Sequence, residues 1–400
     1  MIRYASFFAN LLLSAWLPKG LWMRYLLIVL IVAICPMLSG NTASASCKEN
    51  PCIAVVDAGS SGSRLHVYAY DLEENAPINI KEVYSKKLQP GFASLELNKE
   101  TIHSYLTKLF SGAPDENIPV YFYATAGMRL LSYQKQQEYY NLLNEWFSSQ
   151  SQWQLREAKT ITGKEEGIYG WISVNYEIGT LKTADKPMVG VMDTGGASVQ
   201  ITFPVTDLHA VNIDDRVELD INGRHIQLFV HSFLGLGQNE LAHQFLDFPD
   251  CFSNGYLLPD ATTAHGDFPS CEHEISALIN TVRHVNRTIK TIIESNPINT
   301  WYGIGGIGQI VQTEPLNFQN NEFTLKQLAT KANPEFCQQD WTVLNTNYPG
   351  NEYTYTSCLN ASYIYALLLD GYGINQDQTI NYFPKEQIND DWTLGVVLHH

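Results

Sequence analysis

The sequence predicts an α/β protein built from two similar halves, and three observations support this prediction. Strands and helices alternate along the chain, as in folds whose helices pack on a mostly parallel sheet. An apolar strand enters DAGSSGSR at 57–64, and a second apolar strand enters DTGGASVQ at 193–200. The chain has 400 residues, 45% of them hydrophobic, which suffices for two domains or for one domain with a deep split.

The first half begins with an apolar strand at 53–56, which enters the first glycine-rich loop and returns as a strand at 65–70. Helical periodicity over 101–110 ends at a glycine and a proline. A buried strand is expected at 120–124, and a polar amphipathic helix at 133–147. The first half is therefore expected to form a sheet with helices packed on it.

The second half repeats this pattern after a helix expected at 164–176, which contains two glycines. A strand at 188–192 enters the second glycine-rich loop, and a strand at 201–203 leaves it. The longest helix of the chain is expected at 275–294, and a strand at 300–304 runs into several glycines. The repeated order of strand, Asp-x-Gly turn and strand predicts two related sheets.

The first 45 residues have the pattern of a secretory signal peptide. A short apolar run at 25–38 follows Met23-Arg24 and leads to small residues before Ser46. The run is shorter than the roughly 20 residues that span a bilayer, so cleavage is favoured over an uncleaved membrane anchor. Met23 is an alternative start. We expect a secreted, extracellular protein without a membrane anchor, exported through the periplasm if the source is a Gram-negative bacterium.

The cysteines agree with export. Six remain once Cys35 leaves with the signal peptide, and an oxidising compartment favours disulfides. Their positions favour pairs that are close in sequence, namely Cys47–Cys52, Cys251–Cys271 and Cys337–Cys358. A zinc site is the alternative, but neither a CxxC spacing nor a histidine pairing supports it.

The formal net charge of −16 argues against a nucleic-acid partner, because such proteins need a basic field. An anionic substrate would have to be held by backbone dipoles, a few arginines and a divalent metal ion. The two glycine-rich loops provide such a site. Glycine lets the backbone approach a phosphate closely, and an aspartate at the end of each strand, Asp57 or Asp193, can hold a hydrated cation.

Five segments resemble, in order and spacing, the apyrase-conserved regions of the ecto-nucleoside triphosphate diphosphohydrolases. They are DAGSSGSR (57–64), ATAGMR (124–129), ITGKEEGIYGWISVNY (161–176), DTGGASVQ (193–200) and SFLGLGQNE (232–240). WTLG at 392–395 resembles the C-terminal motif of the family, whereas 241–380 matches weakly. The chain looks like a soluble, secreted, bacterial member of this family.

The resemblance implies two RNase H-like lobes of the actin-like ATPase superfamily, with the active site in the cleft between them. We expect lobe I to comprise 46–162 and 378–400, and lobe II to comprise 163–377. It also implies that Glu166 is the catalytic base and that Ser198 and Gln200 orient the attacking water. Glu165 is the alternative base, and since neighbouring helix positions face about 100° apart, only one should point inward. Both glutamates could instead merely complement the helix dipole.

The same motifs imply the ligand-binding residues. A divalent cation, Mg²⁺, Ca²⁺ or Mn²⁺, would be held largely through waters by Asp57, Asp193 and Thr125. The phosphates would be bound by Ser60, Ser61, Gly62, Ser63, Arg64, Arg129, Gly195, Gly196 and Ala197. The nucleobase would stack on Tyr353, Tyr355 or Trp392, each of which could equally be ordinary packing. The glycines of 303–308 could form a platform near the base, or simply a tight turn.

The resemblance therefore predicts a metal-dependent hydrolase, acting as a monomer on ATP, ADP, GTP, GDP, UTP and UDP. Water would attack the terminal phosphoryl group directly and leave a nucleoside monophosphate. An exopolyphosphatase would share the paired loops, but the segments SGSR (61–64) and EEGIYGW (165–171) favour an apyrase. A kinase would need an acceptor site. A secreted protein that only binds nucleotide would show binding without magnesium-dependent phosphate release.

Overall fold

The structure is a computed structural model. It describes residues 46–73, 76–114, 116–183, 185–221, 223–349, 354–384 and 391–399. The predicted signal peptide, 1–45, lies outside the described residues. Within them, no helix combines the length and the apolar character needed to cross a membrane.

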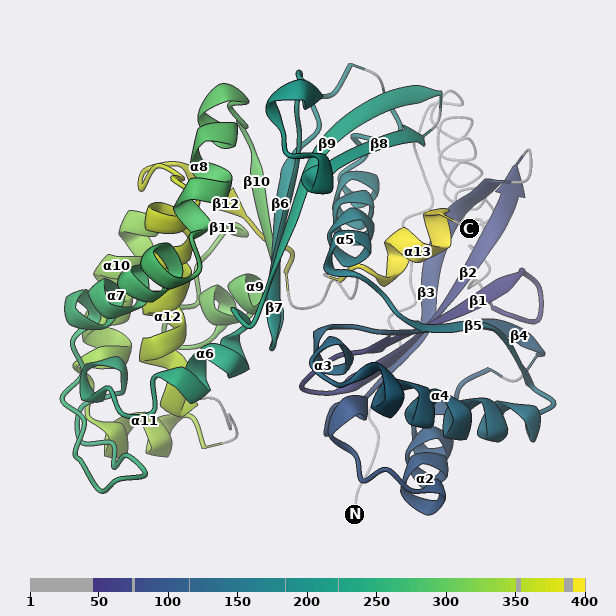
Figure 1. Ribbon diagram of the computed structural model, residues 1–400, viewed down its shortest axis with the longest axis horizontal. Coiled ribbons are helices and arrows are strands. Elements are labelled where there is room, and N and C mark those ends of the chain that lie inside the picture. The colour runs from purple at the N-terminus through teal and green to yellow at the C-terminus, as the bar shows by residue number, and fades with distance from the viewer. Residues whose placement is uncertain are drawn as a thin grey trace, which may run out of the picture. The chain divides into compact units, whose positions relative to one another are not determined.

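The first sheet has five strands in the order β3–β2–β1–β4–β5 (Figure 1). The strands are β1 (Cys52–Ala58), β2 (Ser63–Glu73), β3 (Ala76–Leu88), β4 (Ile118–Ala124) and β5 (Trp153–Thr160). The first glycine-rich loop joins β1 to β2 as an antiparallel hairpin, whereas β4 and β5 continue the sheet in parallel. One face packs on α2 (Lys99–Phe110) and α4 (Tyr133–Ser148), and α3 (Ala126–Arg129) is a single turn after β4.

The second sheet has seven strands in the order β11–β12–β10–β6–β7–β9–β8. They are β6 (Gly190–Thr194), β7 (Ser198–Pro204), β8 (Arg216–Ile221), β9 (Arg224–Leu234), β10 (Trp301–Gly305), β11 (Glu322–Thr324) and β12 (Thr379–Asn381). The second glycine-rich loop joins β6 to β7, and β10 and β12 run parallel to β6. The inner five strands therefore repeat the order and directions of the first sheet, as predicted.

The strand β12 bears on the proposed lobe boundaries. It lies in the 378–400 segment that we assigned to lobe I, yet it pairs with β10 of the second sheet. The C-terminal helix α13 (Thr393–His399) instead shares a buried cluster with residues of β1 and β2. A division of the chain into lobes would therefore fall after Asn381 rather than before residue 378.

The helix α5 (Gly163–Glu177) lies between the two sheets, with α13 beside it (Figure 1). It is buried on nearly every side, so its sequence lacks the polar face of a surface helix. Gly167 allows this close packing, because a Cβ there would lie 2.9 Å from Thr202 Oγ1 on β7. The helix predicted at 164–176 is confirmed, and Gly167 has a packing reason.

Helices cover the outer face of the second sheet and form the largest buried cluster of the protein. They are α6 (Gln238–Gln244), α7 (Phe268–Ala277), α8 (Val285–Ser295), α9 (Gly306–Gln312), α10 (Leu325–Ala332), α11 (Trp341–Asn347) and α12 (Ser357–Ala366). The prediction of one helix at 275–294 is wrong. A π-helical turn at Leu278–Val282 and a left-handed His284, with φ of 57°, separate α7 from α8. Val282 is 61% exposed, although its position continues the helical spacing of apolar residues in the sequence.

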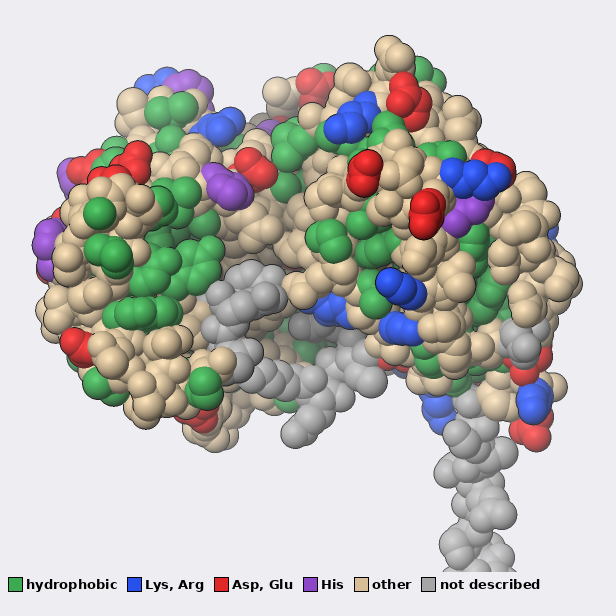
Figure 2. Space-filling view, turned by 90° about the horizontal axis from the view of Figure 1, so that it is seen from below, with side chains coloured by type: hydrophobic (Ala, Val, Ile, Leu, Met, Phe, Trp, Pro, Cys, Tyr) green, Lys and Arg blue, Asp and Glu red, His purple; other side chains and the backbone are tan. Residues whose placement is uncertain are grey.

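The three predicted disulfides, Cys47–Cys52, Cys251–Cys271 and Cys337–Cys358, are all present. The first ties the N-terminal end of β1 to the preceding turn, and the other two lie in the helical layer. Figure 2 shows one face of the molecule, where acidic and basic side chains are interspersed among the described residues. That face offers no continuous basic area of the kind that nucleic acids need.

Candidate active site

A cleft of about 1020 Å³ is lined by the glycine-rich loops of both sheets. The predicted residues that border it are Asp57, Ser60, Ser61, Gly62, Ser63, Arg64, Thr125, Glu166, Asp193, Gly195, Gly196, Ala197, Ser198, Tyr355 and Trp392. The tertiary structure therefore brings residues of all five motif segments to one cleft. The phosphate-binding candidate Arg129 and the catalytic candidate Gln200 do not line it but contact Ser198 and Glu166, which do.

The two glycine-rich loops face each other closely. A Cβ at Gly196 of the second loop would lie 2.4 Å from Ser60 Oγ and 2.7 Å from Ser61 Oγ of the first. Glycine is therefore required at this position by the approach of the opposite loop rather than by its own backbone angles. Backbone N–H groups of glycine-rich loops this close together can bind phosphate oxygens between them.

Asn239 at the start of α6 bridges the two loops, although sequence reasoning did not assign it a role. Its backbone N–H donates to Gly196 O (2.8 Å), and its side-chain Nδ2 donates to Ser61 Oγ (2.9 Å). Gln238 N–H donates likewise to Gly195 O (3.0 Å). Both residues belong to the fifth motif, SFLGLGQNE, and this membership is the sequence feature that could have identified them.

Glu166 is held by side chains from two other elements. Gln200 Nε2 on β7 donates to Glu166 Oε2 (3.0 Å) and lies 2.8 Å from Ser198 Oγ. Arg129, at the end of α3, forms an ion pair with Glu166 and donates to Ser198 Oγ (3.2 Å). The Glu166 side chain is 8% exposed and borders the cleft. A carboxylate, a hydroxyl and an amide thus converge where the cleft meets α5.

The neighbouring Glu165 has a different environment. Its carboxylate accepts hydrogen bonds from Thr162 N (2.7 Å) and Thr162 Oγ1 (2.9 Å), completing a capping box at the start of α5. It also pairs with Lys159 at 3.2 Å. Glu165 therefore caps the helix, while Glu166 faces the cleft, as the 100° step between helix neighbours requires.

Asp57 lies at the end of β1, and its Oδ1 is buried without a hydrogen-bond partner. Burial, and next the carboxylates of Asp391 and Glu166, raise the pKa of Asp57 to about 7, although Arg64 and His66 act in the opposite direction. A buried carboxylate oxygen without a donor, close to other carboxylates, fits a hard divalent cation. Asp193 and Thr125 border the same cleft.

The residues proposed for the nucleobase have different surroundings. Tyr355 borders the cleft and stacks on Tyr256, with ring centroids 5.8 Å apart. Trp392 is only 3% exposed and stacks on Tyr123 (6.4 Å) and Tyr169 (6.3 Å). Its ring packs against these two side chains, and Trp392 also borders the cleft, so its stacking on a base stays a prediction. Tyr353 lies outside the described residues.

The glycine-rich stretch after β10 is a strand end followed by α9 rather than an isolated tight turn. Gly305 adopts a positive φ of 63°, and a Cβ there would lie 2.7 Å from Asp193 Oδ1. This stretch therefore packs against the second aspartate. Gly305 and Gly306 border the cleft, so a platform beside the ligand stays a prediction.

Comparison with known proteins gives related sequences of similar length. Probable apyrase 3 of Arabidopsis thaliana is 27% identical over 419 residues, covering 90% of this chain and 84% of that protein. Ectonucleoside triphosphate diphosphohydrolase 1 of Bos taurus is 27% identical over 437 residues, covering 92% and 85%. These relatives come from a plant and an animal, and they give no support to the expected bacterial origin.

Solved structures show the same fold at low sequence identity. A nucleoside triphosphate hydrolase from Neospora caninum matches with a TM-score of 0.61 at 16% identity, over 94% of this chain and 96% of that one. The Ppx/GppA family member of Aquifex aeolicus matches with a TM-score of 0.53 at 13% identity, over 87% and 97%. The predicted α/β fold with two related sheets is confirmed.

The match to a family model extends over both halves of the chain. It covers residues 44–248 and 259–400, including most of the region in which the motif resemblance was weak. The five motif segments also lie around one cleft, so the structure agrees with the motif resemblance. The chain is an enzyme that belongs to the GDA1/CD39 (nucleoside phosphatase) family.

Proposed function

We propose that this protein is a secreted, divalent-cation-dependent hydrolase that converts nucleoside tri- and diphosphates to nucleoside monophosphates. The observation that carries the proposal is the convergence of Glu166, Ser198 and Gln200 beside two facing phosphate-binding loops. The names of the relatives, an apyrase and an ectonucleoside triphosphate diphosphohydrolase, point the same way.

In this proposal a water molecule attacks the terminal phosphorus directly. Ser198 Oγ and the Gln200 amide orient the water, and a Glu166 carboxylate oxygen accepts its proton as the new P–O bond forms. The bond between the terminal phosphorus and its bridging oxygen breaks, and the shorter nucleotide leaves with that oxygen. Backbone N–H groups of the two loops and the guanidinium groups of Arg64 and Arg129 stabilise the developing charge.

The cation would be held by Asp57 and Asp193, with Thr125 nearby. Among the described residues, no group of three or more His, Cys, Asp or Glu side chains is arranged to ligate an ion, so contact largely through waters is proposed. When bound, the cation neutralises phosphate charge and so favours attack by water.

Removing divalent cations with EDTA is therefore expected to abolish phosphate release, because the phosphate charge is then no longer neutralised. Adding back Mg²⁺ or Ca²⁺ in excess should restore it. Phosphate release is measured with purified protein lacking residues 1–45. Undiminished activity in EDTA would contradict the metal requirement.

The pH profile tests the role of Glu166. Burial raises its pKa above the ordinary 4.5, although Arg129 opposes the rise. A base acts only when deprotonated, so the acid limb of kcat is expected above pH 4.5, at saturating cation. Arg129→Ala removes the opposing charge and should move the limb to still higher pH. If the acid limb of kcat stays at the same pH in this variant, the pKa of Glu166 does not determine that limb.

A substrate panel separates the proposal from its rivals. We expect phosphate release from ATP and ADP, and little from long-chain polyphosphate. Activity confined to polyphosphate would favour an exopolyphosphatase on the same fold. Tight nucleotide binding without phosphate release would favour a nucleotide-binding protein. A base stacked on Tyr355 predicts similar activity on GTP and UTP, because aromatic stacking does not read the edges of a base.

A further inference from the structure

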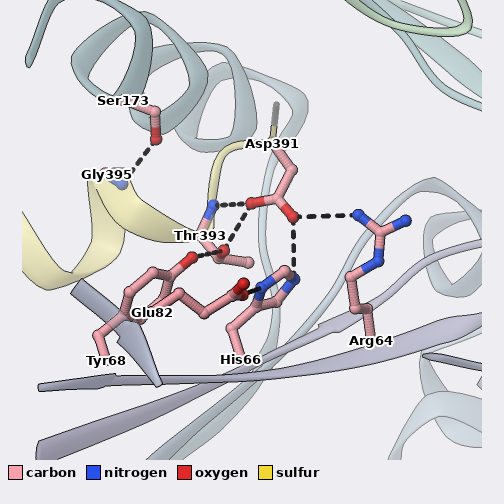
Figure 3. Close-up of polar contacts among 8 residues, drawn as sticks. All are labelled: Arg64, His66, Tyr68, Glu82, Ser173, Asp391, Thr393 and Gly395. Atoms are coloured by element: carbon pink, nitrogen blue, oxygen red, sulfur yellow. Dashed lines mark hydrogen bonds and ion pairs between the residues drawn. The ribbon is translucent and has the colours of Figure 1, made fainter. Parts of the chain in front are cut away.

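A cluster of four charged side chains lies at the edge of the cleft, and only its arginine takes part in the mechanism above (Figure 3). Arg64 and His66 come from β2, Glu82 from β3, and Asp391 from the segment that leads into α13. The ring nitrogens of His66 face two carboxylates: Nδ1 pairs with Glu82, and Nε2 lies 2.9 Å from Asp391 Oδ2. The same Asp391 oxygen lies 3.4 Å from Arg64 Nη1.

This geometry favours a charged histidine. The His66 side chain is fully buried, and the side chains of Glu82 and Asp391 are 5% and 12% exposed. A neutral imidazole would present a lone pair to one of the two carboxylates, whereas an imidazolium presents an N–H to each. Burial alone would lower the pKa of His66, but Asp391 and Glu82 outweigh it and raise that pKa to about 9. Two positive and two negative charges then balance.

Asp391 is fixed from both sides. Its Oδ1 accepts hydrogen bonds from Thr393 N (2.8 Å) and Thr393 Oγ1 (2.5 Å), which cap the start of α13. Thr393 Oγ1 in turn lies 2.7 Å from Tyr68 Oη on β2. The helix α13 is thereby held on the first sheet, with Asp391 Oδ2 left to face His66 and Arg64.

Arg64 is the member of the cluster that reaches the cleft. Its side chain is 29% exposed and borders the cleft together with Asp391. An isolated carboxylate at this place would repel substrate phosphates. His66 offsets that charge from the buried side, so Asp391 can hold Arg64 without presenting a net negative field to the ligand.

We propose that Asp391 is a positioning residue for phosphate binding, which orients Arg64 toward the cleft while buried His66 offsets its charge. The proposal rests on the proposed function, because Arg64 is assigned to the substrate phosphates there. It adds the C-terminal segment to the phosphate-binding machinery, although no part of that segment was assigned to phosphates from the sequence.

Asp391→Asn is the informative substitution. The asparagine oxygen can still accept from Thr393, and its amide can donate to Nε2 of a neutral His66 that keeps its proton on Nδ1. The cluster then holds one positive and one negative charge and stays neutral. A change in phosphate affinity therefore reports the orientation of Arg64 rather than net charge.

A double-mutant cycle measures whether Asp391 acts through Arg64. The readout is the Kd of a non-hydrolysable ATP analogue, by calorimetry with saturating Mg²⁺, for wild type, Arg64→Ala, Asp391→Asn and the double variant. We expect Asp391→Asn to weaken binding about tenfold in the wild-type background, which corresponds to about 1.4 kcal/mol. In the Arg64→Ala background the same change should weaken binding less than about twofold.

The control is Asp215→Asn, which removes a carboxylate 2.7 Å from His231 Nδ1, away from the residues that line the cleft. It should leave Kd unchanged. Should Asp391→Asn fail to fold by thermal melting, His66→Gln replaces it in the same cycle. Equal loss of affinity in both backgrounds, or none in either, overturns the proposal. Binding without hydrolysis in the wild type overturns only the proposed function, and absence of binding overturns both.

Discussion

Replacing Glu166 with alanine is expected to lower kcat by about 10²- to 10⁴-fold, the range for loss of a general base. Glu166 is the carboxylate that borders the cleft, and Gln200 and Arg129 hold it there. Its loss also leaves Arg129 partly buried without that partner, so thermal melting must accompany the kinetics. Phosphate release from ATP at saturating Mg²⁺ is the measurement.

Glu165→Ala is the matched control, because it removes the same side chain from the adjacent position. It deletes half of a capping box, so we expect a loss of about 1 kcal/mol in stability and near wild-type kcat. The reverse outcome, with Glu165→Ala inactive and Glu166→Ala active, would exchange the two roles. Near wild-type turnover in both variants would remove the general base from the mechanism.

Gly395→Ala is expected to destabilise the protein by at least about 3 kcal/mol, the upper range for an overpacked core. A Cβ at Gly395 would lie 2.1 Å from the backbone oxygen of Tyr169 on α5, and backbone atoms cannot rotate away. The N–H of Gly395 also donates to Ser173 Oγ of α5 (2.8 Å, Figure 3). The added methyl group should separate α13 from α5, which urea unfolding would detect.

Gly308→Ala makes the same chemical change where there is room. A Cβ there would meet only Gln312 Nε2 at 3.5 Å and more distant atoms, which is ordinary contact. Alanine favours helices over glycine by up to about 1 kcal/mol, so stability should hold or rise slightly. If both variants unfolded at the same urea concentration as wild type, the close packing of α13 on α5 would be contradicted.

Local patterns predicted most elements because they depend on neighbours in the sequence. The glycine-rich loops, their flanking strands and α5 follow from periodicity and turn residues. The prediction of one helix at 275–294 was wrong because hydrophobic periodicity carries no information about this break. No glycine or proline marks the break at His284, and apolar residues continue on both sides of it.

Trp392 shows a second limit of sequence reasoning. An aromatic residue in a motif is equally suited to a ligand site and to packing, and the sequence leaves both open. The structure packs its ring against Tyr123 and Tyr169, which come from β4 and α5. These contacts join residues more than 200 positions apart, so the sequence could not show them.

The sequence by itself determined the chemistry available to this protein: two Asp-x-Gly loops, a pair of adjacent glutamates, and a serine and glutamine two residues apart on one strand. Side chains two apart on a strand share a face, so Ser198 and Gln200 had to act together. Only the tertiary structure decided which glutamate joins them. Glu165 contacts Thr162 and Lys159 and caps the helix. Glu166 contacts Gln200 and Arg129 and faces the cleft.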